Sequence, residues 1–135
     1  MIVADASIVA NALGDDGADG AAARSALRTE RDLAAPDLVD VETVSVLRRR
    51  WLNGDLTARR FRTAIADLAD LAIVRHPTLP FMPRAYELRS NVTPYDAAYI
   101  GLAETLGCEL VTADARLAAD AGWVERAPDG PRGHL

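Results

Sequence analysis

Four short apolar runs are distributed along the chain between longer segments with helical periodicity. They predict strands over residues 1–5, 33–36, 72–76 and 108–112. The runs are continuously apolar rather than alternating, which is typical of strands buried on both faces of a parallel sheet. Residues 123–126 could form a last strand. The pattern therefore predicts a three-layer α/β/α fold, with helices on both faces of a mainly parallel central sheet.

Periodicity and capping residues place the helices between these strands. Helices are expected over residues 7–14, 21–32, 37–54, 55–71, 83–91, 93–107 and 114–122, with a mobile loop at 15–20. Ser7 and Asp37 stand where N-caps are favoured, and Asn53-Gly54 suits a helix end. We expect a single domain over residues 1–135, in which the Pro- and Gly-rich residues 127–135 form a flexible tail.

Composition narrows the class of protein. Half of the 135 residues are hydrophobic, which predicts a packed core, and the net charge of −5 excludes a protein that coats nucleic acid by bulk electrostatics. No apolar run approaches the ~20 residues of a membrane helix, and the start does not resemble a signal peptide. The lone Cys108 excludes an intramolecular disulfide and fits a reducing cytoplasm, where we expect the protein to act.

Two aspartates follow apolar strands directly. Asp5 ends the strand at residues 1–5, and Asp114 follows the strand at residues 108–112. Ligands of parallel sheets bind beyond the carboxyl ends of the strands, so both residues lie where a site is expected. An unpaired buried charge is unfavourable by several kcal/mol, and Asp5 therefore needs a partner. Asp114 could instead serve only as the N-cap of the next helix.

Two further carboxylates occupy largely apolar helical surroundings. Asp96 lies three residues after Thr93, a spacing that also fits a capping box. Glu42 projects from the apolar side of its helix, and the chain contains no lysine to pair with it. If the four acids converge, their mutual repulsion raises their pKa values unless a cation neutralises them. Oxygen ligands without histidine or thiolate favour Mg²⁺ or Mn²⁺ over zinc.

Four segments in order, "VADAS", "VETVSVLRRR", "TPYDAAYIGLAE" and "LVTADARL", resemble the PIN domain, and the chain is similar in size to VapC toxins of VapBC toxin–antitoxin modules. The resemblance implies a Mg²⁺- or Mn²⁺-dependent endoribonuclease that forms a homodimer and is restrained by a VapB-type antitoxin. It places the catalytic and metal-binding acids at Asp5, Glu42, Asp96 and Asp114, and a catalytic hydroxyl at Thr112. Ser7 matches the small polar residue after the first acid, where it could hold a water or cap the helix.

Other functions stay open on sequence alone. A non-catalytic PIN-like module could bind RNA or protein, although such a module does not need a full set of buried acids. A phosphoacceptor domain also uses acids at strand ends, but it requires a lysine. The arginines at 48–50 and 59–62 could form a solvated helix face, contact RNA phosphates or pair with antitoxin acids. Catalytic acids alone do not distinguish RNA from DNA.

Overall fold

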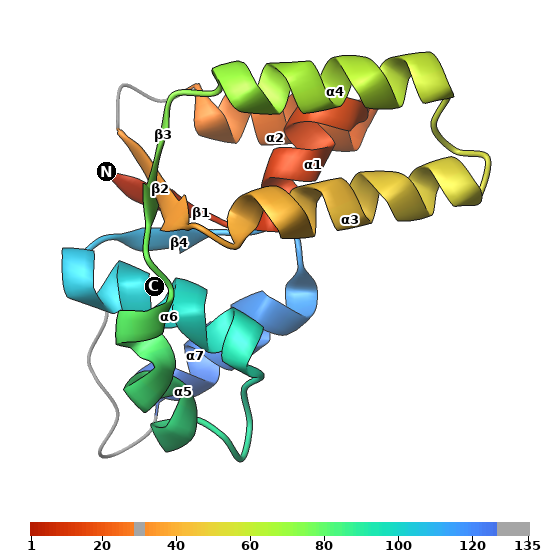
Figure 1. The fold of residues 1–135 in the computed structure, drawn as a ribbon. Helices are drawn as coiled ribbons and strands as arrows, with labels where there is room; N and C mark the ends of the chain where they lie inside the picture. Colours follow the sequence, from red (N-terminus) through yellow and green to blue (C-terminus); the bar gives the residue numbers. More distant parts are fainter. Residues whose placement is uncertain (29–31, 127–135) are drawn as a thin grey trace.

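A four-stranded parallel sheet lies at the centre of the molecule (Figure 1). The structure is a computed structural model that describes residues 1–28 and 32–126, with side chains described up to residue 121. The strands are β1 (Ile2–Ala4), β2 (Leu33–Pro36), β3 (Ile73–His76) and β4 (Glu109–Val111). Their order in the sheet is β3-β2-β1-β4, and all neighbouring pairs are parallel. The predicted parallel sheet and the α/β class are confirmed.

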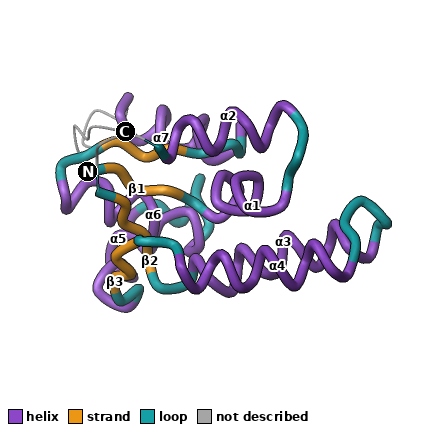
Figure 2. The backbone as a smooth tube through the Cα atoms, turned by 90° about the horizontal axis from the view of Figure 1, so that it is seen from above, coloured by secondary structure: helices purple, strands orange, loops and turns teal. Residues whose placement is uncertain are grey.

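Two groups of helices cover the two sides of this sheet. One group contains α1 (Ala6–Gly14), α2 (Ala18–Leu27), α3 (Val39–Leu52) and α4 (Ala58–Asp70). The other contains α5 (Met82–Glu87), α6 (Pro94–Leu106) and α7 (Ala115–Arg126), with a short 3₁₀ turn before α5 at Leu79–Phe81. Figure 1 shows the groups on opposite sides of the sheet, and Figure 2 shows α3 and α4 together as the predicted hairpin. The three predicted layers are therefore present.

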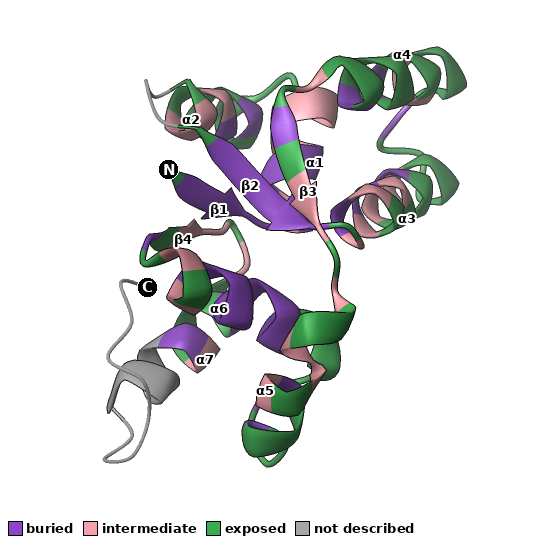
Figure 3. Ribbon diagram, turned by 60° about the vertical axis from the view of Figure 1, so that its left-hand side comes forward, coloured by how far each residue is buried: buried purple, intermediate pink, exposed green. Residues whose placement is uncertain are grey.

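The two inner strands of the sheet, β1 and β2, are buried along their whole length (Figure 3). Ile2, Val3 and Ala4 are fully buried, and they share one core cluster with Val9 of α1 and Tyr99 of α6. The core therefore packs β1 from both faces, which explains why its sequence is apolar at every position rather than at alternate ones. The residue that follows β1 is consequently held by a rigid scaffold.

Two N-cap predictions are wrong. Asp5, not Ser7, is the N-cap of α1, because its side chain accepts the hydrogen bond from the Ile8 N–H. Leu38, not Asp37, precedes α3, and it makes no side-chain capping bond. The Asp37 carboxylate instead accepts a hydrogen bond from the hydroxyl of Thr78, a residue 41 positions later that local pattern could not reveal.

The strand expected at residues 123–126 is also wrong, since α7 continues as a helix to Arg126. The helix expected at 21–32 begins earlier, at Ala18, and ends at Leu27. The loop before α2 is therefore shorter than expected. Asp15 Oδ1 accepts hydrogen bonds from the N–H groups of Gly17 and Gly20, and these bonds stabilise the start of α2. The tail predicted at 127–135 lies outside the described residues. In the part of the chain that is described, no helix is long and apolar enough to span a bilayer.

Candidate active site

The strand order determines where a site can form. After β1 the chain builds β2 and β3 on one side, and β4 later pairs with β1 on the other side. Such a reversal leaves a crevice beyond the carboxyl ends of the two adjacent strands. Ala4 pairs with Val111 in the register, and the Asp5 N–H donates to the Val111 carbonyl at 3.2 Å. Asp5 and the residues after β4 therefore meet at the crevice.

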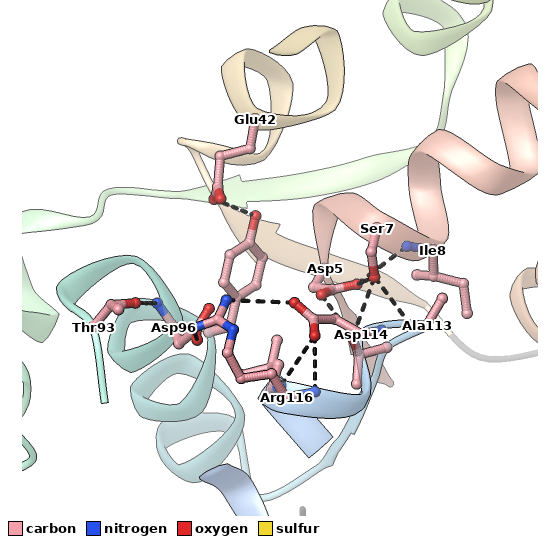
Figure 4. A network of polar contacts seen from close by, with 12 residues as sticks. Asp5, Ser7, Ile8, Glu42, Thr93, Asp96, Ala113, Asp114 and Arg116 are labelled. Carbon is pink, nitrogen blue, oxygen red and sulfur yellow. Dashed lines mark hydrogen bonds and ion pairs between the residues drawn. The ribbon is translucent and has the colours of Figure 1, made fainter. Parts of the chain in front are cut away.

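Both carboxylate oxygens of Asp5 are engaged by hydrogen bonds (Figure 4). Oδ1 accepts from the Ser7 hydroxyl at 2.8 Å and from the Ile8 N–H at 3.2 Å. Oδ2 accepts from the Thr112 hydroxyl at 2.7 Å. The residue is only 4% exposed, so these bonds replace the water that it has lost. They also hold the carboxylate in one orientation.

The same two hydroxyls connect Asp5 to the segment that carries Asp114. The Ala113 N–H donates to Ser7 Oγ at 3.1 Å, and the Asp114 N–H donates to Thr112 Oγ1 at 2.9 Å. Asp114 Oδ1 accepts from the N–H groups of Arg116 and Leu117 at 2.8 and 3.4 Å. Asp114 therefore does cap α7, as the alternative interpretation predicted. Capping uses Oδ1, while Oδ2 lies 3.4 Å from the guanidinium group of Arg116.

Glu42 of α3 has the partner that the sequence left unidentified. The hydroxyl of Tyr99 in α6 donates to Glu42 Oε1 at 3.0 Å. Tyr99 is only 2% exposed and belongs to the hydrophobic core. The sequence pattern alone assigned no role to Tyr99. A buried tyrosine normally needs a partner for its hydroxyl, and this was the signal that could have identified the pair. The bond joins two helices from opposite sides of the sheet.

Asp96 of α6 lies across the pocket from Glu42. Its N–H donates to the Thr93 hydroxyl at 3.2 Å, so Thr93 caps α6 as expected. The Asp96 carboxylate instead faces Arg116, whose Nη1 lies 2.8 Å from Oδ2 (Figure 4). Asp96 Oδ2 is buried, and its ion pair with Arg116 does not have the alignment of a hydrogen bond. Among the described residues, no group donates a hydrogen bond to this oxygen. Arg116 was missed from sequence, although an arginine in the first turn of a helix is electrostatically unusual.

Burial dominates the electrostatics of the pocket. Loss of water raises the pKa values of Asp5, Glu42 and Asp96 above the ordinary values for their side chains. Repulsion adds to this as a smaller cause: Asp114 raises the pKa of Asp5, and Asp96 raises that of Glu42. The Arg116 charge opposes the rise at Asp96. The predicted repulsion is therefore present, but burial is the main reason for the raised pKa values.

An open pocket of about 450 Å³ gives solvent access to two of these acids. Its lining consists of Val41, Glu42, Ser45, Thr93, Tyr95, Asp96 and Arg116. A larger pocket of about 670 Å³ lies between α1 and the α3–α4 connection and contains none of the predicted site residues. We assign the site to the smaller pocket because the buried acids, rather than volume, carry the reactive chemistry.

The donor atoms suit a hard divalent cation, since they are carboxylate and hydroxyl oxygens without histidine or thiolate. The buried Asp96 Oδ2, which lacks an aligned donor, also fits a cation ligand. No three acidic, histidine or cysteine side chains among the described residues are arranged as a ready-made cation site, however. The guanidinium group of Arg116 lies between Asp96 and Asp114. A cation that binds both carboxylates therefore has to displace Arg116.

Fold and site together define an α/β domain with an acidic pocket beyond the carboxyl ends of its parallel strands. Residues 2–122 match the model of the PIN domain. Ribonuclease VapC9 of Mycobacterium tuberculosis is 44% identical over 125 residues, which cover 93% of this chain and 94% of the relative. Ribonuclease VapC1 of the same organism is 39% identical over 121 residues, with 89% and 90% covered. The chain therefore belongs to the PIN-domain family, among the VapC ribonucleases.

A solved structure supports the fold independently. The crystal structure of VapC20 from Mycobacterium tuberculosis, described as a sarcin–ricin loop cleaving toxin, superimposes with a TM-score of 0.66. The alignment covers 88% of this chain and 94% of VapC20, at 20% identity. At this identity the comparison establishes the shared fold alone.

The raised pKa values predict a specific pH dependence for the metal-free protein. Because Asp5, Glu42 and Asp96 hold protons more tightly when folded, the native state binds more protons than the unfolded chain at pH values above the ordinary carboxyl range. Their contribution to stability is present at low pH and is lost as the pH rises through the folded pKa values. We expect the melting temperature in EDTA to fall from pH 5 to pH 8, and to fall less in Asp5→Asn. An equal or larger fall in that variant would contradict this account of the pocket.

Proposed function

We propose that this protein is a Mg²⁺- or Mn²⁺-dependent endoribonuclease toxin in which Asp5, Asp96 and Asp114 hold the cation, with Glu42 beside them. The observation that carries the proposal is the convergence of four acids, which come from the end of β1, from α3, from α6 and from the β4–α7 junction, around one crevice (Figure 4). Membership among the VapC ribonucleases supports RNA cleavage. A non-catalytic binding module would gain nothing from burying Asp5 and Asp96, which is unfavourable for the fold.

The chain's own residues prepare the site for hydrolysis. Ser7 and Thr112 orient the Asp5 carboxylate, and Tyr99 fixes Glu42 against the pocket. When bound, a divalent cation neutralises the acids that would otherwise repel an RNA phosphate, and it activates water. Attack of water on phosphorus, with departure of the 3′ oxygen, leaves 5′-phosphate and 3′-hydroxyl ends. The Ser7 hydroxyl acts here as a positioning group for Asp5 rather than as a helix cap.

The rim of the pocket suits an unpaired RNA base. Tyr95, next to Asp96 in α6, is 62% exposed, and the exposed Val41 lies on the α3 side of the same pocket. Unstacked bases of RNA loops commonly stack on aromatic side chains, whereas bases inside a duplex are not available for this contact. VapC20 is described as cleaving the sarcin–ricin loop. We therefore propose that the substrate of this protein is also a single-stranded loop.

The proposed partner is a VapB-type antitoxin that binds the α3–α4 hairpin. Trp51, Leu52 and Ile65 are exposed there, and Trp51 and Ile65 line a shallow apolar pocket of about 250 Å³. This apolar surface lies nine residues beyond Glu42 in α3, or about 14 Å along the helix. An antitoxin segment of moderate length can therefore cover the apolar surface and place a basic side chain in the acidic pocket. A homodimer and a cytoplasmic location complete the proposal.

Replacement of single acids tests the catalytic assignment. We expect Asp5→Asn and Asp96→Asn to lower RNA cleavage with Mg²⁺ or Mn²⁺ by about a hundredfold or more, because each removes a charge that the cation needs. The melting temperature in EDTA should stay equal or rise, since one member of a repelling cluster becomes neutral. Asp67→Asn, at an exposed position of α4, is the control and should leave cleavage unchanged. Full activity of both pocket variants would show that the acids are only helix caps and core residues.

A matched tyrosine pair tests the contact with an unpaired base. Tyr95 and Tyr86 are 62% and 66% exposed, but only Tyr95 lines the acidic pocket. We expect Tyr95→Ala to lower kcat/KM on a loop RNA by roughly 5- to 150-fold, the loss of one stacked base of about 1–3 kcal/mol. Tyr86→Ala should have no effect, and both variants should keep the wild-type melting temperature. Equal kcat/KM values for the two variants would rule out a base platform at Tyr95.

A further inference from the structure

Arg116 occupies the position between two of the proposed metal ligands. Its Nη1 lies 2.8 Å from Asp96 Oδ2, and its Nη2 lies 3.4 Å from Asp114 Oδ2 (Figure 4). Among the described basic residues, no other forms an ion pair with an acid of this pocket. One guanidinium group thus joins a carboxylate of α6 to a carboxylate at the start of α7.

The place of Arg116 in its helix needs an explanation. It is the second residue of α7, where the free N–H groups of the helix disfavour a positive charge. Asp96, Asp114 and Asp120 offset this, because all three stabilise the charged form of Arg116. The acids therefore determine where this arginine rests. Any group that neutralises them instead removes the reason for the guanidinium to stay.

The side chain is also free to leave. It is 58% exposed, whereas the Asp96 side chain that it contacts is 9% exposed. Because the guanidinium end of this ion pair is open to water, solvent screens it and weakens the pair. A divalent cation carries twice the charge and binds the same carboxylate oxygens more strongly. The arginine can therefore be displaced without breaking the packing of α7, whose buried contacts are made by Leu117 and Ala121.

We propose that Arg116 is a mobile internal cation: it neutralises Asp96 and Asp114 in the metal-free protein, competes with the divalent cation for them, and then binds a phosphate of the RNA. The proposal rests on the metal-dependent cleavage proposed above. Arg116 lines the open pocket together with Tyr95, so a displaced guanidinium group stays beside the substrate. Its planar fork suits two phosphate oxygens. The same residue thus stabilises the empty site and holds the substrate in the loaded one.

Binding of Mn²⁺ alone tests the competition. We expect Arg116→Gln to bind Mn²⁺ about two- to fivefold more tightly than wild type in calorimetry at low salt, the fold-change that corresponds to a weak ion pair. Its melting temperature should fall in EDTA and match wild type with saturating Mn²⁺. Arg59→Gln removes the same charge from the exposed surface of α4 and should change neither quantity. A melting temperature that is lower both with and without Mn²⁺, or unchanged Mn²⁺ affinity, would show a merely structural role and overturn the proposal.

Cleavage kinetics at saturating Mn²⁺ test the contact with phosphate. Arg116→Gln should raise KM for a loop RNA, and the slope of log kcat/KM against log salt should weaken by about 0.7, the value for one phosphate contact on a single strand. Arg116→Lys keeps the charge but loses the fork, so it should keep the wild-type Mn²⁺ affinity and recover only part of KM. An unchanged KM and slope in Arg116→Gln would contradict the second half of the proposal. If the wild-type protein neither bound Mn²⁺ nor cleaved RNA, the proposed function itself would be wrong. If the wild type were active and the Arg116 variants behaved like it, only the role proposed for Arg116 would be wrong.

Discussion

The burial of the Asp5 carboxylate at the end of the central strand is the constraint on which the rest of the structure depends. A charge in this position is stable only if both of its oxygens are satisfied, and Ser7, Ile8 and Thr112 do this. Those hydrogen bonds tie the start of α1 to the segment after β4. They thereby determine the position of Asp114 and the start of α7. Arg116, in the first turn of α7, then lies within ion-pair distance of Asp96.

Structural and functional roles are not alternatives at this site. Asp5 caps α1 through Oδ1, and Asp114 caps α7 through its own Oδ1. In each residue the second oxygen is directed elsewhere: Asp5 Oδ2 meets Thr112, and Asp114 Oδ2 meets Arg116. A carboxylate has enough acceptor sites for both tasks. Capping explains how these side chains are held in place, whereas the proposed cation explains why so many of them share one crevice.

The sequence predicted the parts of this arrangement that depend on local pattern. Continuous apolar runs identified the four strands, and their carboxyl ends located Asp5 and Asp114, because strand direction alone brings those ends together. The Glu42–Tyr99 bond spans 57 residues, and Asp96 pairs with Arg116 on a different helix. Such partners follow from packing between helices, which periodicity within one helix does not reveal. The strand predicted at residues 123–126 was wrong for a different reason: a segment of four residues, two of them apolar, fits the end of a helix as well as a strand.

The central claim is that Asp5 at the end of β1, Asp96 of α6 and Asp114 at the β4–α7 junction share one divalent cation. Anomalous diffraction at the manganese edge, from wild-type crystals equilibrated with saturating Mn²⁺ at neutral pH, tests it most directly. The account predicts a single region of anomalous density in contact with the carboxylates of Asp5, Asp96 and Asp114 or with their bound waters, and a guanidinium group of Arg116 turned away from it. Density confined to other acidic residues, or none at this crevice under saturating Mn²⁺, would contradict the claim.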